Sequence, residues 1–199
     1  MKEEKQQNGC LIGLFVAVGV LVLFVVISFF YLKGIYNGIV SSDEAIDASW
    51  AQVETVLQRR YDLIPNLINT VKGFANQEKE VLTEVTALRS QWAKAGSVAD
   101  KAKAATGLES ALGRLMVISE RYPELKSNQN FLRLQDELAG TENRISVERR
   151  RFNQAVQNYN MRVRRFPGNI IASNTGFEKR EAYFEAVSDA DAPPVVDFQ

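Results

Sequence analysis

The chain has 199 residues, in which 24 lysines and arginines balance 24 aspartates and glutamates, with one cysteine and no histidine. This length is enough for one domain with a buried core, and the balanced charge gives the whole chain no electrostatic reason to bind nucleic acid. Because histidine is the commonest general base and metal ligand, its absence argues against most hydrolases and metal sites, and we expect no metal and no cofactor.

Residues 11–32 read LIGLFVAVGVLVLFVVISFFYL and carry no charged side chain. As a helix they span roughly 30 Å, the thickness of a bilayer's hydrocarbon core. No small-residue cleavage motif follows, so we predict an uncleaved transmembrane helix after an N-terminal tail at residues 1–10, rather than a buried core helix. Lys2 and Lys5 precede the span and Lys33 follows it, a difference too small for the positive-inside rule to orient the helix.

A heptad pattern marks the first helix beyond this anchor. Ser41 and Glu44 have the spacing of a capping box, which predicts a helix start one or two residues after the serine. The pattern continues to about Ala95, where Ala-Gly-Ser breaks it. Apolar side chains at twelve of fourteen positions are typical of a helix in a bundle or coiled coil. The two rows are Ile46, Val53, Arg60, Leu67, Phe74, Val81, Leu88 and Trp50, Leu57, Ile64, Val71, Glu78, Val85, Trp92.

Pro65 lies inside this expected helix. An interior proline removes a backbone donor, costs about 3 kcal/mol, and kinks or ends a helix. No glycine or serine loop is present for a sharp reversal, and the heptad register continues past the proline. We therefore favour a kink over a hairpin at Pro65 and leave both open.

Two further helices are predicted, one from Ala99 to about Arg121 and one from about Gln129 to Arg165. The connection between them is short, so they should pack antiparallel. The later helix carries a row repeating every seven residues, and a companion row that is polar at three of its five positions. These rows are Phe131, Leu138, Ile145, Phe152, Tyr159, Phe166 and Gln135, Glu142, Arg149, Val156, Val163.

A short helix is expected near residues 178–186, after which residues 188–199 form an acidic tail that we expect to be disordered. The sequence has no β-rich stretch and no repeat beyond the heptads. It therefore predicts an all-α fold, in which an N-terminal transmembrane helix precedes an elongated up-and-down bundle of three to four helices over residues 33–187.

Several motifs beyond the anchor resemble the LemA family. The most specific is RRYDLIPNL at residues 59–67, followed by NTVKG at residues 69–73. The other similar stretches are Tyr36-Asn37, residues 122–126, 131–135, 141–145 and 150–153, Tyr159-Asn160 and Phe166-Pro167. The resemblance covers nearly the whole chain beyond the anchor. Tyr61 departs from it, because relatives often carry a small residue there, and we expect Tyr61 on a helix surface.

This resemblance implies a membrane-anchored helical bundle of bacteria with no established activity, linked in some bacteria to a membrane zinc protease and envelope stress. We expect a scaffold or interaction protein at the bacterial cell membrane. It would bind the lipid bilayer through residues 11–32 in a single pass, and bind another envelope protein or form a homo-oligomer, but not nucleic acid. An adaptor or regulator of a membrane protease, and an organiser of the lipid surface, are the alternatives. No motif places a nucleophile beside a base, so we do not expect an enzyme.

Four charged residues interrupt the apolar rows: Arg60, Glu78, Glu142 and Arg149. A charge at a core position is costly unless an opposite charge compensates it. We therefore predict a polar network that fixes the register of the helices, in which Arg60 contacts Glu142 and Glu78 contacts Arg149. The alternative is that these long side chains reach solvent from partly covered rows.

Residues 144–165 contain seven arginines and one acidic residue, Glu148. Six of the arginines form a candidate interaction surface for an acidic partner or lipid headgroups: Arg144, Arg150, Arg151, Arg162, Arg164 and Arg165. The alternative is a solvated face paired with acidic neighbours. RNA binding would need interleaved stacking aromatics, whereas Phe152 and Tyr159 belong to the apolar row.

Overall fold

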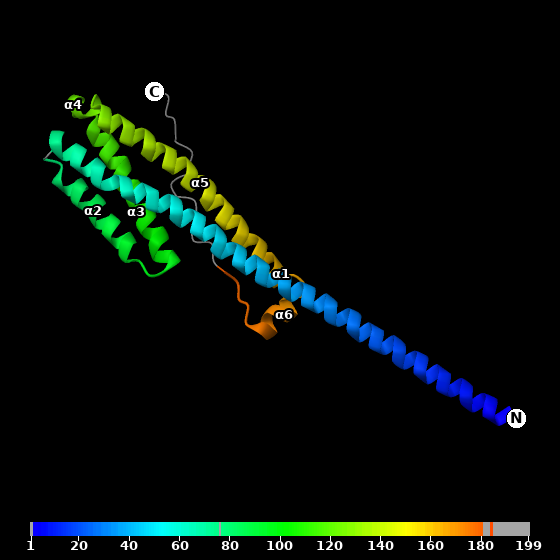
Figure 1. The fold of residues 1–199 in the computed structure, drawn as a ribbon. Helices are drawn as coiled ribbons and strands as arrows, with labels where there is room; N and C mark the ends of the chain where they lie inside the picture. The colour runs from blue at the N-terminus through cyan, green and yellow to red at the C-terminus, as the bar shows by residue number, and fades with distance from the viewer. Residues whose placement is uncertain (1, 76, 181–183, 185–199) are drawn as a thin grey trace, which may run out of the picture. The chain divides into compact units, whose positions relative to one another are not determined.

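A computed structural model of the chain describes residues 2–75, 77–180 and 184. The described residues form helices joined by short connections, and none of them lies in a strand (Figure 1). The helices are α1 (Lys2–Phe74), α2 (Lys79–Lys94), α3 (Val98–Ser119), α4 (Pro123–Lys126), α5 (Gln129–Arg164) and α6 (Gly168–Thr175). The fold is therefore all-α, as predicted.

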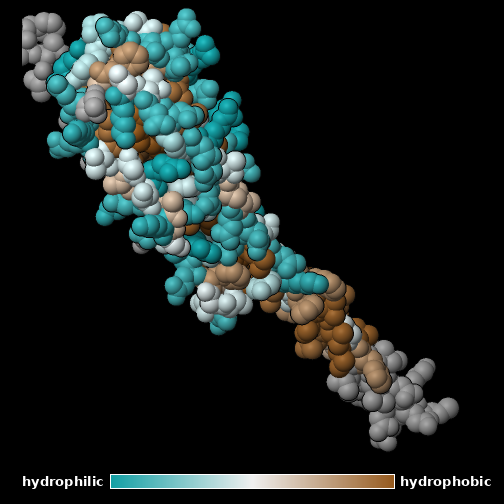
Figure 2. Space-filling model, turned by 60° about the vertical axis from the view of Figure 1, so that its left-hand side comes forward, coloured by the Kyte–Doolittle hydropathy of each residue, from teal (hydrophilic) through white to brown (hydrophobic). Residues whose placement is uncertain are grey.

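The apolar run and the first heptad helix belong to one continuous helix, α1, of 73 residues. The expected helix start after Ser41 is wrong, because no loop precedes it: the Ser42 hydroxyl donates instead to the Gly38 carbonyl one turn back, 2.9 Å away. Among the described residues, α1 is the one helix long and apolar enough to cross a membrane, with a mean hydropathy of 2.9 over its best 18 residues. The large hydrophobic side chains from Phe15 to Leu32 are exposed (Figure 2).

The chain reverses after Phe74, not at Pro65 and not at Ala95. Between α1 and α2 the Glu78 N–H donates to the Ala75 carbonyl over 3.2 Å. The returning helix α2 lies beside α1 (Figure 1) and ends at Lys94. The expected single helix to Ala95 is therefore two helices, and the choice between a kink and a hairpin at Pro65 is settled against the hairpin because α1 continues through it.

Side-chain caps define the starts of α3 and α5. Ser97 accepts from the Asp100 N–H at 3.1 Å, and Asn128 accepts from the N–H groups of Asn130 and Phe131 at 3.0 and 3.1 Å. Such caps satisfy N–H groups that a helix leaves without internal partners. These two helices lie within one or two residues of the predicted bounds, and the single turn α4 occupies the predicted connection.

The C-terminal helix lies earlier than expected. α6 lies between the helix predicted to end at Arg165 and the one expected near residues 178–186, and Gly176, whose positive φ of 79° suits glycine, caps its end. Residues 177–180 are not helical, so the helix predicted near residues 178–186 is wrong over the part that the structure describes. The predicted disordered tail at residues 188–199 lies outside the described residues.

The chain divides into two compact units, one of residues 1–44 with 158–180 and the other of residues 45–157 with 181–199. In the second unit α1, α2, α3 and α5 bury apolar rows against one another. Its most buried side chains include Val53, Leu57, Ile64, Leu67, Val71, Val85, Leu108, Leu115, Phe131 and Ile145. In the first unit the buried side chains include Ile39, Tyr159, Val163 and Ala172.

Candidate functional site

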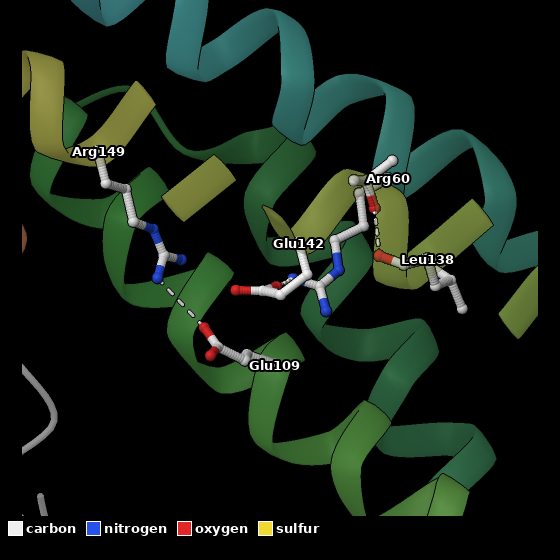
Figure 3. A network of polar contacts seen from close by, with 6 residues as sticks. Arg60, Glu109, Leu138, Glu142 and Arg149 are labelled. Atoms are coloured by element: carbon white, nitrogen blue, oxygen red, sulfur yellow. Dashed lines mark hydrogen bonds and ion pairs between the residues drawn. The ribbon is translucent and has the colours of Figure 1, made fainter. Parts of the chain in front are cut away.

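A buried ion pair joins α1 to α5 inside the second unit. Arg60 lies in the α1 row between Val53 and Leu67, both fully buried, and only 6% of its own surface is exposed. Its Nη1 donates to Oε2 of Glu142 (Figure 3). Glu142 keeps about a third of its side chain exposed. The register of the two helices thus brings together the first pair that the sequence predicted.

Arg149 forms a second pair, with a partner that the sequence did not suggest. Its Nη1 donates to Oε2 of Glu109 on α3 at 3.2 Å (Figure 3). Its guanidinium also lies over the ring of Phe184, with Cζ 4.8 Å from the ring centre, a favourable arrangement for a cation. The predicted contact between Arg149 and Glu78 is therefore wrong.

Glu78 lies elsewhere in the second unit because the chain reverses between α1 and α2. Its Oε1 accepts from Arg121 Nη2 at 3.2 Å and from the Tyr122 hydroxyl at 3.0 Å, both just beyond α3. This hydrogen bond to a carboxylate raises the pKa of Tyr122 above its ordinary value. The four predicted residues consequently form three separate ion pairs rather than one network.

Tyr61 is buried, so the expectation that it lies on a helix surface is wrong. It is 1% exposed and its ring stacks on Trp92 of α2, with centroids 4.3 Å apart. The cause is the missed reversal: α2 packs back on α1, and its Trp92 covers Tyr61. Ile68 and Ala75, which follow Tyr61 at seven-residue spacing, are buried as well. Burial raises the pKa of the Tyr61 hydroxyl above 10, and no partner for that hydroxyl is found among the described residues.

Pro65 and Arg89 explain how α1 continues through a proline. The missing N–H of Pro65 would have donated to the carbonyl of Tyr61, four residues earlier. That carbonyl instead accepts from Nε of Arg89 on α2, at 3.3 Å. A side chain from the returning helix thus replaces the lost backbone donor, a role that the sequence pattern did not indicate.

The six candidate surface arginines are exposed and are divided between the two units. Arg144, Arg150 and Arg151 belong to the second unit, where Arg151 pairs with Glu148 at 2.9 Å. The other three, Arg162, Arg164 and Arg165, belong to the first unit. A binding role for these arginines stays a prediction.

A cleft of about 290 Å³ opens beside the Arg60–Glu142 pair. Its lining residues are Arg60, Glu109, Leu112, Gly113, Met116, Gln135, Leu138, Ala139 and Glu142. The two carboxylates there already contact arginines. Among the described residues, no group of three or more Cys, Asp and Glu side chains is placed to hold a metal ion.

The model of the LemA family matches residues 49–198 of the chain, three quarters of its length. The chain belongs to the LemA family. Its similar relatives include the magnetosome protein MamQ 2 of Paramagnetospirillum magneticum, 28% identical over 79% of this chain and 67% of the relative. MamQ of Magnetospirillum gryphiswaldense is 28% identical over 92% and 75%. Protein LemA of Metamycoplasma hominis is 24% identical over 88% and 78%.

The motif that first suggested the LemA family, residues 59–67, is the centre of the polar contacts in the second unit. It supplies Arg60 for the ion pair with α5, Tyr61 for the stack on α2, and Pro65, whose missing donor Arg89 replaces. Membrane association is consistent with this family and with the apolar part of α1.

Proposed function

We propose that the chain is a membrane-tethered helical scaffold of the bacterial cell envelope, with no catalysis of its own. A single N-terminal pass holds an up-and-down, coiled-coil-like bundle of three to four helices, which binds another envelope protein or a second copy of itself. The observation that carries this proposal is α1. One helix contains both the exposed apolar run and the buried rows that pack against α5.

The chemistry of the described residues also favours binding over catalysis. The buried Arg60 and the partly buried Arg149 are used in structural ion pairs between helices, with Glu142 and Glu109 respectively. Arg144 and Arg150 are exposed on α5. A row of exposed guanidinium groups suits a partner with carboxylates or phosphates.

The experiment is photo-cross-linking of the full chain in living cells, followed by mass spectrometry. A photoreactive amino acid replaces Arg150 in the test variant and Lys103, an exposed cation on α3, in the control. The proposal predicts that position 150 links to one abundant envelope protein or to a second copy of the chain. Diffuse labelling that is equal at both positions would contradict a specific binding surface.

Two other functions would give different products in the same experiment. The resemblance to the LemA family also implies a link to a membrane protease in some bacteria. An adaptor or regulator of such a protease would cross-link mainly to that protease. An organiser of the lipid surface would give mainly lipid adducts at the arginines. The relationship to magnetosome proteins and to LemA supports a membrane location for all three.

A further inference from the structure

We propose that the α5–α6 corner, residues 164–170, is a membrane-binding surface that takes anionic lipid headgroups and the upper acyl chains beneath them. Arg164 and Arg165 would bind the headgroup phosphates, while Phe166 and Ile170 would enter the apolar edge of the bilayer. The inference rests on the proposed function in one respect, because it takes the apolar run of α1 as the anchor. It adds a second membrane contact, made by a different part of the chain.

The height of the corner above the apolar run follows from contacts within the first unit. A β-carbon on Gly168 would lie 3.9 Å from Cγ2 of Ile35, which is three residues beyond Leu32, the end of the run. At about 1.5 Å per residue this is only about 5 Å along α1. The headgroup region on each side of a bilayer is roughly 5 to 8 Å deep. The start of α6 therefore lies at headgroup level, and a tilt of α1 would lower it further.

The segment that follows α6 returns to the same level of α1. The ring of Phe177, two residues beyond the end of α6, lies 6.0 Å from the ring of Tyr36, the next residue after Ile35. The residues at the start of α6 and just after its end thus lie near neighbouring residues of α1. This places the α6 segment near the headgroup region at two separate points.

Close packing holds the corner in this position. A β-carbon on Gly168 would lie 2.3 Å from the backbone carbonyl oxygen of Arg162, so only glycine fits there. A β-carbon on Gly38 would lie 2.6 Å from Nη1 of Arg162, which shows how closely that side chain lies against α1. The end of α5 and the start of α6 are thereby fixed against the segment of α1 that follows the apolar run.

The exposed side chains of the corner have the chemistry of an interfacial surface. Phe166 is 80% exposed and Ile170 is 51% exposed, although both are large and apolar. Residues 33–44 and 158–180 together carry six lysines and arginines against three acidic residues, whereas the whole chain is neutral. Exposed aromatic and aliphatic side chains beside arginines are typical of segments that lie on anionic membranes. A soluble protein partner is the alternative occupant, but the proposed anchor in α1 already brings a bilayer to this height.

The test places a fluorescent probe on single cysteines of the full chain with Cys10→Ser, reconstituted into phosphatidylcholine vesicles with or without phosphatidylglycerol. Quenching is measured with lipids that carry nitroxide on the headgroup or deep in the acyl chain. The test variant is Ile170→Cys. Ser28→Cys lies inside the apolar run and reports the anchor. Ser41→Cys is exposed on α1 about 13 Å beyond the run and is the negative control.

The proposal predicts that headgroup nitroxide quenches the probe at position 170 several-fold more than at position 41, and more strongly with phosphatidylglycerol. Arg164→Gln with Arg165→Gln should remove the added effect of the anionic lipid and leave the probe at position 28 unchanged. Quenching at position 170 no greater than at position 41, while deep nitroxide quenches position 28, would overturn the inference alone. Loss of deep quenching at position 28 would overturn the anchor and the proposed function as well.

Discussion

The two side chains of the Arg60–Glu142 ion pair are buried to different extents, so the loss of either one should change the free energy of unfolding by a different amount. Arg60 is almost fully buried, whereas about a third of the Glu142 side chain is exposed to water. Removing the glutamate leaves a buried cation without a partner, while removing the arginine leaves a carboxylate that water can reach. The two single substitutions should therefore differ, although they break the same contact.

We expect Glu142→Leu to lower the free energy of unfolding by roughly 3 to 5 kcal/mol and Arg60→Met to lower it less. The double substitution should recover much of the loss, because an apolar pair replaces a buried charge. Denaturant unfolding of the full chain in detergent, followed by circular dichroism, measures all three variants. The exposed pair Lys126–Glu120 is the control, where Lys126→Gln should cost under about 1 kcal/mol. Additive single effects would show that the two side chains are not coupled.

Tyr61 should make stability depend on alkaline pH. Its burial raises the pKa of the hydroxyl in the folded state, whereas the unfolded chain ionises near the ordinary value of 10. Above that pH the unfolded state loses a proton that the folded state keeps, so the free energy of unfolding falls as pH rises. Tyr61→Phe keeps the stack on Trp92 and should weaken this fall. Unfolding curves of both proteins between pH 9 and pH 11 make the comparison, and identical slopes would contradict the account.

At the scale of elements, the sequence predicted which segments are helical better than it predicted where each helix begins and ends. α3 and α5 were predicted well because side-chain caps and glycine or proline breaks mark their ends. The reversal between α1 and α2 was missed because Val81, Val85 and Trp92 of α2 continue the α1 register by spacing alone, and no proline marks the reversal. Because this reversal was missed, Tyr61 was expected on a helix surface and Glu78 was expected to contact Arg149.

The hydrogen bond from Arg89 to the Tyr61 carbonyl belongs to this scale, because it supplies a donor where Pro65 has none and α1 continues through the proline. Arg89→Ala should lower the free energy of unfolding by about 1 kcal/mol, since the Tyr61 carbonyl loses its donor. In a Pro65→Ala background the alanine N–H can donate to the same carbonyl, so Arg89→Ala should then cost much less. A double-mutant cycle by denaturant unfolding measures this coupling. Equal costs in the two backgrounds would mean that Arg89 stabilises α1 in some other way.

For the whole molecule, the sequence was sufficient for the fold class and the family but not for the pairing of charges. A heptad row indicates which residues of a helix face the core. It does not indicate which neighbouring helix each of these residues contacts. Arg60 and Glu142 were matched because both interrupt rows of long helices, whereas Glu109 lies outside any such row and could not be foreseen as the partner of Arg149.

We propose that one uninterrupted helix, α1, both anchors the chain in the membrane and contributes to the bundle. Hydrogen exchange of the full chain in lipid nanodiscs, read by mass spectrometry, tests this most directly. We predict that the backbone amides exchange slowly throughout residues 15–71. Lipid protects the apolar run, helical hydrogen bonds protect the middle of the segment, and packing against other helices protects its end. Fast exchange at residues 33–44, or apolar-run exchange as fast as that of residues 177–180, would contradict the claim.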